Sequence, residues 1–146
     1  MNKRIIAIGC DHAGFEYKEA LCASLNAEGY QVLNFVTDSP ASVDYPDFVH
    51  PLCNAIENGK AELGILICGS ANGVCMTANK HRHIRGAICW ENELAKLARA
   101  HNNANVICIP ARFVSLELAA SMVNEFLITP FEGGRHERRV EKISLS

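Results

Sequence analysis

Short runs of β-branched and other apolar residues alternate along this chain with longer segments of helical periodicity. This alternation is typical of repeated βαβ units and predicts one α/β domain with a mostly parallel, five-stranded sheet. The runs predict strands at Arg4 to Gly9, Gln31 to Phe35, Leu63 to Cys68, Arg85 to Cys89 and Val106 to Pro110.

Start and stop signals predict helices between these strands. The segment from Phe15 to Glu28 carries apolar residues at helical spacing and stops at Gly29, a natural C-terminal cap. Similar signals delimit two further helices, one from Asp44 and Pro46 to Asn58 and Gly59, the other from Ser115 to Thr129 and Pro130.

Composition narrows the class of function. The 146 residues fit a single domain over 1–146. A net charge of −2 with 49% apolar residues argues against a nucleic-acid partner and favours small-molecule chemistry. Seven cysteines, odd in number and without C-x-x-C spacing, argue against a disulfide framework and a zinc site. No apolar run approaches membrane-spanning length, so we expect a cytoplasmic protein with no membrane partner.

A glycine-rich turn, Cys68-Gly69-Ser70-Ala71-Asn72-Gly73, follows the third predicted strand and leads into a predicted helix. Such a turn points backbone N–H groups at a bound anion or a developing oxyanion. The same field favours the thiolate, so Cys68 is a candidate nucleophile or base. The alternative is a buried strand-end cysteine. A phosphatase loop of the C-x5-R type is excluded because position 74 is Val74.

Other polar residues follow predicted strands or helices and have two interpretations each. Asp11 and His12 are either a helix N-cap with a surface histidine or part of a site at the carboxyl edge of the sheet. His101, next to Asn102, is either a partner of a helix C-terminus or a catalytic group.

Several basic and aromatic residues also have more than one interpretation. Arg135 and Arg139 lie one helical turn apart, either on a solvated face or, with Arg112, in a phosphate clamp. Trp90 either lines a pocket or packs. His81 and His83 fall in a predicted loop, where we expect no metal role.

Six segments taken together resemble the B-type ribose-5-phosphate isomerases and the related galactose-6-phosphate and allose-6-phosphate isomerases, over Ile5 to about Ile143. The segments are Gly9 to Phe15, Asp44-Tyr45-Pro46, Ile67 to Ser70, Ala78-Asn79-Lys80, Arg99 to Asn102 and Phe131 to His136. The resemblance implies a flavodoxin-like or Rossmann-like three-layer sandwich that needs no metal or cofactor. It also implies a homodimer or a pair of dimers with sites between subunits, and residues 131–146 in contact with a neighbour.

The resemblance also implies roles. Cys68 matches the base that moves a proton between C1 and C2 of the open-chain sugar phosphate, and His101 the residue that opens the furanose ring. The amides of Gly69, Ala71, Asn72 and Gly73 match the loop that holds the enediolate, with the Ser70 hydroxyl beside it. Substrate contacts are implied for Asp11, His12, Asn102, Arg112, Arg135 and Arg139.

Two positions depart from the family pattern. Ala71 replaces the middle glycine of the turn, and Val36 stands where a glycine commonly ends the turn after the second strand. If position 71 needs a positive φ, alanine costs about 1 to 2 kcal/mol of local strain. The expected consequence is a reshaped cradle or altered substrate choice with activity retained. The sequence leaves three substrates open: a pentose 5-phosphate, allose 6-phosphate and galactose 6-phosphate. A sugar-phosphate-binding protein without catalytic activity is the remaining alternative.

Overall fold

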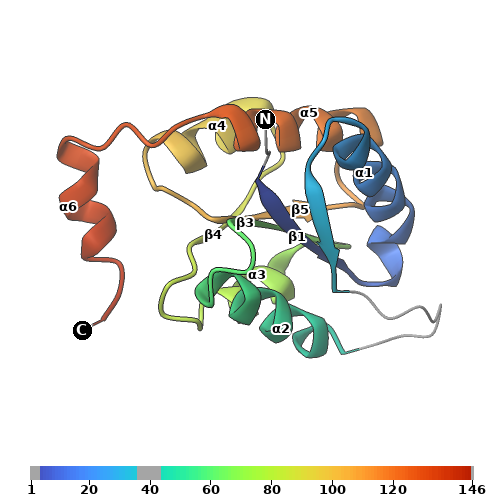
Figure 1. Cartoon of the computed structure of the whole chain (residues 1–146), viewed down its shortest axis with the longest axis horizontal. Coiled ribbons are helices and arrows are strands. Elements are labelled where there is room, and N and C mark those ends of the chain that lie inside the picture. Colours follow the sequence, from blue (N-terminus) through green and yellow to red (C-terminus); the bar gives the residue numbers. More distant parts are fainter. Residues whose placement is uncertain (1–3, 36–43, 146) are drawn as a thin grey trace.

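The computed structural model describes residues 4–35 and 44–145 (Figure 1). The strands are β1 (Ile5–Cys10), β2 (Gln31–Asn34), β3 (Leu63–Cys68), β4 (Gly86–Ile88) and β5 (Val106–Pro110). The helices are the 3-10 turn η1 (His12–Gly14), α1 (Phe15–Ala27), α2 (Pro46–Glu57), α3 (Asn72–Ala78), α4 (Asn92–Ala100), α5 (Leu116–Ile128) and α6 (Arg135–Glu141).

Within these residues the strands form one sheet in the order β2-β1-β3-β5-β4, and each recorded pairing is parallel. The predicted α/β class and five-stranded sheet are therefore confirmed, and every predicted strand lies within one residue of its observed bounds. The chain leaves β1 toward β2 on one side and continues to β3 on the other. The order thus reverses between β1 and β3, where an open α/β sheet binds its ligands.

Local signals explain the helix ends. Helix α1 ends just before Gly29. This residue has a φ of 93°, which glycine adopts without strain. Pro46 occupies the first turn of α2, where its missing N–H costs nothing. The Ser115 hydroxyl accepts from the Leu118 N–H at 3.1 Å and caps α5.

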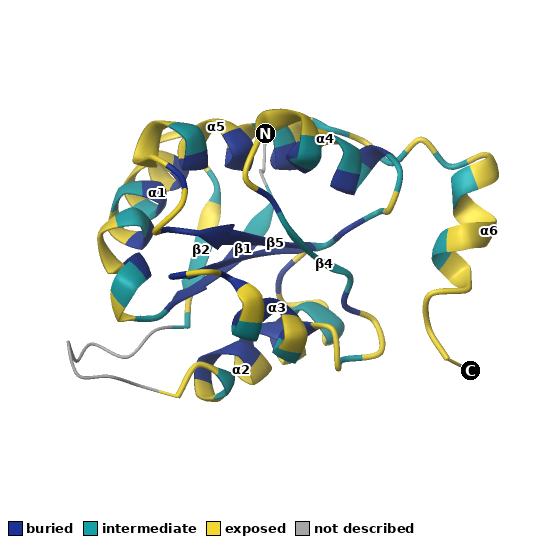
Figure 2. Cartoon of the chain, turned by 180° about the vertical axis from the view of Figure 1, so that it is seen from behind, coloured by how far each residue is buried: buried dark blue, intermediate teal, exposed yellow. Residues whose placement is uncertain are grey.

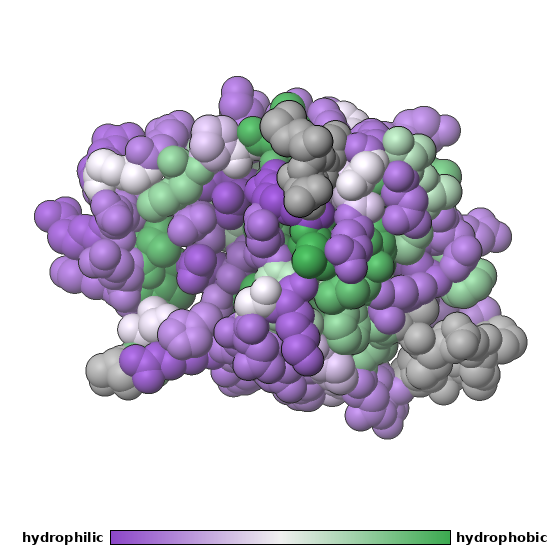
Figure 3. All heavy atoms as spheres, in the orientation of Figure 1, coloured by the Kyte–Doolittle hydropathy of each residue, from purple (hydrophilic) through white to green (hydrophobic). Residues whose placement is uncertain are grey.

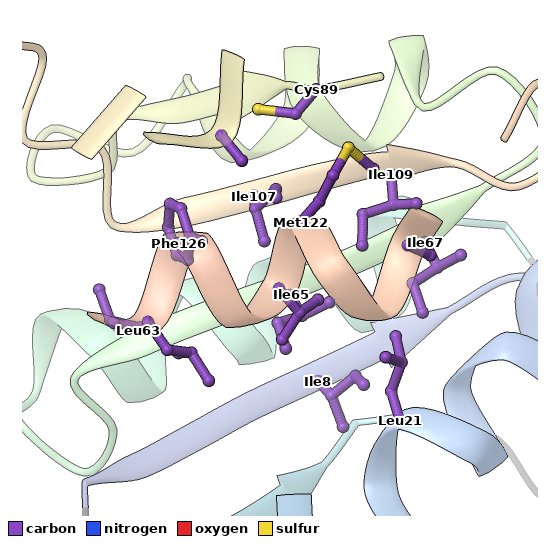
Figure 4. Close-up of a cluster of buried hydrophobic side chains, with 14 of the residues drawn as sticks. Ile8, Leu21, Leu63, Ile65, Ile67, Cys89, Ile107, Ile109, Met122 and Phe126 are labelled. Atoms are coloured by element: carbon purple, nitrogen blue, oxygen red, sulfur yellow. The ribbon is translucent and has the colours of Figure 1, made fainter. Parts of the chain in front are cut away.

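Helices cover both faces of the sheet and complete the three layers (Figure 1). Alternate strand residues face α1, α4 and α5 on one side and α2 and α3 on the other, because side chains along a strand alternate between faces. Figure 4 shows the first core, where Met122 and Phe126 of α5 pack over the strand isoleucines. The buried positions of α1 to α5 point toward the sheet (Figure 2). This rigid packing fixes where each strand ends.

The C-terminal helix α6 stands apart from the rest of the domain (Figure 1). It has no buried residue, and its outer side is hydrophilic (Figure 3). Gly133 and Gly134, with φ of 69° and 54°, turn the chain into it. A groove of about 680 Å³ lies between the end of the chain and the segment 79–87. The Ser144 hydroxyl donates to the Arg82 carbonyl at 3.0 Å across it. None of the helices in the described part of the chain is long and apolar enough to cross a membrane.

Candidate active site

Asp11 and Cys68 meet where the strand order reverses. Asp11 follows β1, and its backbone N–H donates to the Ile67 carbonyl of β3 at 3.1 Å. One carboxylate oxygen caps η1 by accepting from the Gly14 N–H at 3.0 Å, which confirms the N-cap interpretation. The other oxygen accepts from the Cys68 thiol at 3.0 Å. The N-cap therefore also pairs a carboxylate with a thiol at the carboxyl edge of the sheet.

The Cys68 thiol is more strongly protonated than expected. Burial, the hydrogen bond to Asp11 and the charge of that carboxylate raise the pKa of Cys68 to about 11, from an ordinary 9.0. The backbone N–H groups of Gly69 and Ala71 act in the opposite direction, as the turn predicts, but they are outweighed. The thiolate character expected from the turn is therefore not favoured in the single chain, because burial and, after it, the Asp11 carboxylate outweigh the backbone N–H groups.

The glycine-rich turn has the backbone geometry expected at position 71. Ala71 has a φ of 66°, is fully buried and forms the N-cap of α3. Its methyl group packs in the core below the turn, so the left-handed conformation of a non-glycine residue is held by burial. The Ser70 hydroxyl lies at the exposed rim, 3.4 Å from the Asn72 N–H and 3.3 Å from its amide nitrogen.

Arg112 reaches the same turn from β5. Its backbone N–H donates to the Gly69 carbonyl at 3.1 Å. Its side chain lies across Gly69, because a Cβ there would sit 3.3 Å from the Arg112 Nε and 3.4 Å from its Cζ. Arg112 is exposed, so its guanidinium is available to an anion bound over the turn. His12 is likewise exposed, in η1 directly after Asp11.

Tyr45 is a neighbour of the turn that the sequence did not assign to the site. A Cβ on Gly73 would lie 2.4 Å from the Tyr45 Cζ and 2.7 Å from its hydroxyl oxygen. Glycine is therefore required at position 73 by the phenol that lies against it. The segment Asp44-Tyr45-Pro46 is among the motifs of the family, which was the available signal for its place here.

The remaining candidate residues lie at the opposite edge of the sheet. His101 and Asn102 precede β5, whose first residue, Val106, pairs with Gly64 near the start of β3. Cys68 is four steps along the strand from Gly64, about 13 Å at roughly 3.3 Å per residue. Cys68 and His101 therefore do not meet within one chain.

Arg135 and Arg139 lie on α6, beyond His101, and both are exposed. Their predicted spacing of one helical turn is confirmed by the helix, and α6 stands at the side of the domain opposite α1 (Figure 1). The structure thus divides the candidate residues into two groups. One group surrounds Cys68, and the other surrounds His101.

The group around His101 has two neighbours that the sequence did not assign. His101 stacks on His136, with ring centroids 4.2 Å apart and planes 11° from parallel. The Nε2 atom of each ring lies 3.7 Å from the same carboxylate oxygen of Glu132. These ligand atoms fall within 4.8 Å of one another, as a metal site would require. The parallel rings oppose that use, because an ion in the plane of one ring lies out of the plane of the other.

Three other candidates have separate places. Trp90 follows β4 with 52% of its surface exposed, so it does not pack in the core. His81 accepts or donates at 3.0 Å with Glu57 and at 2.7 Å with His50, which gives it a structural hydrogen-bond role on the α2 side. Val36 lies outside the described residues.

An open parallel sheet with a thiol, a carboxylate and a glycine-rich turn at its switch point defines an α/β small-molecule site. The comparisons identify the family. The model of the ribose/galactose isomerase family matches residues 6–143, so the chain belongs to that family.

Named relatives agree with this assignment. Ribose-5-phosphate isomerase B of Escherichia coli K12 is 42% identical over 139 residues, which cover 95% of this chain and 93% of the relative. A ribose 5-phosphate isomerase structure from Thermotoga maritima superposes with a TM-score of 0.95 at 45% identity, covering 98% of this chain and 99% of the other. The Mycoplasma genitalium ribose-5-phosphate isomerase B, solved with bound ribulose-5-phosphate, gives a TM-score of 0.92 at 39% identity, covering 98% and 95%.

Proposed function

We propose that this protein is an aldose-ketose isomerase that interconverts ribose 5-phosphate and ribulose 5-phosphate through an enediolate. The observation that carries the proposal is the 3.0 Å pair of Cys68 and Asp11 below a glycine-rich turn, in a chain of this family. Moving a proton between C1 and C2 needs a base and a preorganised cradle for the oxyanion that forms. The carboxyl edge of this sheet provides both.

Cys68 is the base in this proposal. A thiolate of high pKa is a strong base, but few molecules hold it at neutral pH. Asp11 lies in position to accept the thiol proton and then to contact a sugar hydroxyl. The Ser70 hydroxyl and the backbone N–H groups of the turn, including those of Gly69, Ala71, Asn72 and Gly73, stabilise the enediolate oxygens.

The complete site combines two chains. One chain supplies the carboxyl edge of its sheet, and a neighbour supplies the residues at its amino edge and on α6. This explains why two groups of candidates lie about 13 Å of strand apart in a single chain. The first chain contributes His12 and Arg112 to substrate binding, and the second contributes His101, Asn102, Arg135 and Arg139.

Assembly also changes the electrostatics of the base. The two arginines of α6 bring positive charge toward the turn, and positive charge favours the thiolate. A homodimer or pair of dimers, with residues 131–146 of each chain against its neighbour, is the arrangement we propose. No cofactor or metal is invoked. Seven free cysteines fit a reducing compartment such as the cytoplasm.

A coupled assay of the purified protein against ribose 5-phosphate, allose 6-phosphate and galactose 6-phosphate tests the substrate. We expect turnover of the pentose phosphate. Cys68→Ala should lower kcat at least a hundredfold and leave sugar-phosphate binding by calorimetry within about threefold, since the thiol acts in proton transfer. Cys22→Ala, in α1, is the control and should retain activity. Turnover of Cys68→Ala within tenfold of wild type would remove Cys68 as the base.

Mixed variants test the shared site. Cys68→Ala and the double variant Arg135→Ala/Arg139→Ala should each be nearly inactive alone. After mixing and subunit exchange, a dimer of one chain of each kind assembles one site with an intact thiol and both arginines. Activity should then return to a fraction of wild type. If mass spectrometry shows exchanged dimers and the mixture stays inactive, the arginines are not shared between chains.

A further inference from the structure

Glu132 joins two imidazoles at the amino edge of the sheet. His101 ends α4, Glu132 lies between α5 and α6, and His136 is in the first turn of α6. The Glu132 backbone N–H donates to the Ala100 carbonyl at 3.0 Å, which fixes the carboxylate beside the residue that follows. Two helices and a connecting segment therefore converge on one carboxylate oxygen, 3.7 Å from the Nε2 atom of each histidine.

Two positive charges on the stacked rings would repel each other. Imidazoles with centroids 4.2 Å apart repel when both are protonated, and one carboxylate does not compensate two cations. Desolvation, followed by the positive charges of His101 and Arg135, lowers the pKa of His136. Glu132 opposes this shift, and Arg139 adds to it. These effects together favour the neutral form of His136.

The exposure of the side chains also distinguishes the two rings. The His136 side chain is 12% exposed and is the more buried ring of the stacked pair, whereas the His101 side chain is 37% exposed. His101 therefore presents its ring to solvent or to a ligand, and His136 supports it from behind. The other charged groups that act on the pair are Glu132, Arg135 and Arg139.

We infer that Glu132 and His136 are positioning residues, which keep His101 protonated and fix its ring so that it can open the furanose of the substrate. This inference rests on the proposed isomerase function. In the step, the bond from C1 to the ring oxygen breaks, and the ring oxygen takes a proton from the His101 imidazolium. The anomeric hydroxyl loses its proton to water as the carbonyl forms, and the imidazole regains a proton from solvent.

Glu132→Gln tests the electrostatic part, with Glu137→Gln as a matched control for charge on the exposed side of α6. NMR titration of the His101 ring should show its midpoint lowered by about one pH unit in Glu132→Gln and unchanged in Glu137→Gln. The rate with cyclic ribose 5-phosphate at pH 8 should fall about tenfold in Glu132→Gln. The rate with ribulose 5-phosphate, an open-chain ketose, should fall less than twofold once the equilibrium constant is allowed for.

His136 tests the stacking part. His136→Phe keeps an aromatic ring under His101 without a titrating group and should retain at least half of the aldose rate, whereas His136→Ala should lose about fivefold. An unchanged His101 midpoint in Glu132→Gln, or equal losses for aldose and ketose, would overturn the electrostatic role. Equal activity of His136→Phe and His136→Ala would overturn the stacking role. Absence of pentose phosphate turnover in the wild type would instead refute the proposed function. The NMR titration would still show whether Glu132 acts on the His101 ring.

Discussion

Asp11→Asn tests whether a carboxylate from β1 keeps Cys68 protonated. The amide has nearly the same shape and its oxygen can still accept from the Gly14 N–H, but it carries no negative charge. Cys68 has a pKa of about 11 in the native chain against an ordinary 9.0, with burial as the largest cause and Asp11 as the next. The full gap corresponds to about a hundredfold more thiolate at pH 8. Because burial remains in the variant, we expect the pKa to fall by about one unit.

The alkylation rate should rise less than the thiolate population does. Nucleophilicity falls about threefold for each unit by which the thiol pKa falls, since the Brønsted coefficient is roughly 0.4 to 0.5. Alkylation of Cys68 at pH 8 should therefore be about three- to fourfold faster in Asp11→Asn, and about tenfold faster if the whole shift were removed.

Iodoacetamide is the suitable reagent because it is uncharged and does not respond to the lost carboxylate itself. Peptide mass spectrometry reports each cysteine separately. Cys22 on α1 is an internal reference, because burial, Lys18 and Glu19 determine the direction of its pKa shift and Asp11 has no part in it. A ratio of Cys68 to Cys22 alkylation that is unchanged or lower in Asp11→Asn would refute the argument. A midpoint below pH 9 for Cys68 in the wild type would do the same.

Two further predictions concern the stability of the fold. Gly14→Ala would place a Cβ 2.7 Å from the Ile67 Cγ2 and 2.9 Å from the Ile67 carbonyl oxygen, so chemical denaturation should show a free energy of unfolding lower by about 1 to 3 kcal/mol. The control Gly86→Ala, whose Cβ would lie 3.5 Å or more from its neighbours, should lower it by less than about 1 kcal/mol. Burial opposes ionisation of Glu57, but hydrogen bonds from His81 and the following loop lower its pKa below 4.5, so this group stabilises the fold above that pH. Glu57→Gln should lower the Tm at pH 7, and the difference in Tm from the wild type should vanish as the pH falls through the native pKa of Glu57. The same difference in Tm at pH 7 and at about pH 3 would exclude the charge as the cause.

The fold was predictable because its signals are local. Hydrophobic periodicity and the turn residues that flank each run predicted the strands from Leu63 to Cys68 and from Val106 to Pro110 at their observed bounds. The family pattern, in which a glycine commonly occupies position 71, raised a positive φ there as a condition, and Ala71 has a φ of 66°. Each of these features depends on residues within a few positions in the chain.

The chemistry of the site was less predictable because it depends on distant partners. The turn alone predicts a thiolate at Cys68, but burial and the carboxylate of Asp11, 57 residues away, raise the pKa of Cys68 instead. Tyr45 contacts Gly73 only through packing of α2 beside α3. Likewise, no spacing rule indicates that His136 stacks on His101 across the glycine pair that precedes α6. Sequence identifies such residues one at a time, and packing decides which of them act together.

In the site that we propose, the two edges of the sheet explain why a second copy of the chain would be needed. The distance between Cys68 and the start of β5 is set by paired strands buried in the core, so no loop movement inside one chain can remove it. Each chain nevertheless carries both groups. A two-fold axis that brings the amino edge of one chain to the carboxyl edge of another also does the reverse, because an isologous contact is reciprocal. Two complete sites then arise from one interface. The separate position of α6, with its exposed Arg135 and Arg139, is what such an arrangement requires of a segment whose ligand lies on another chain.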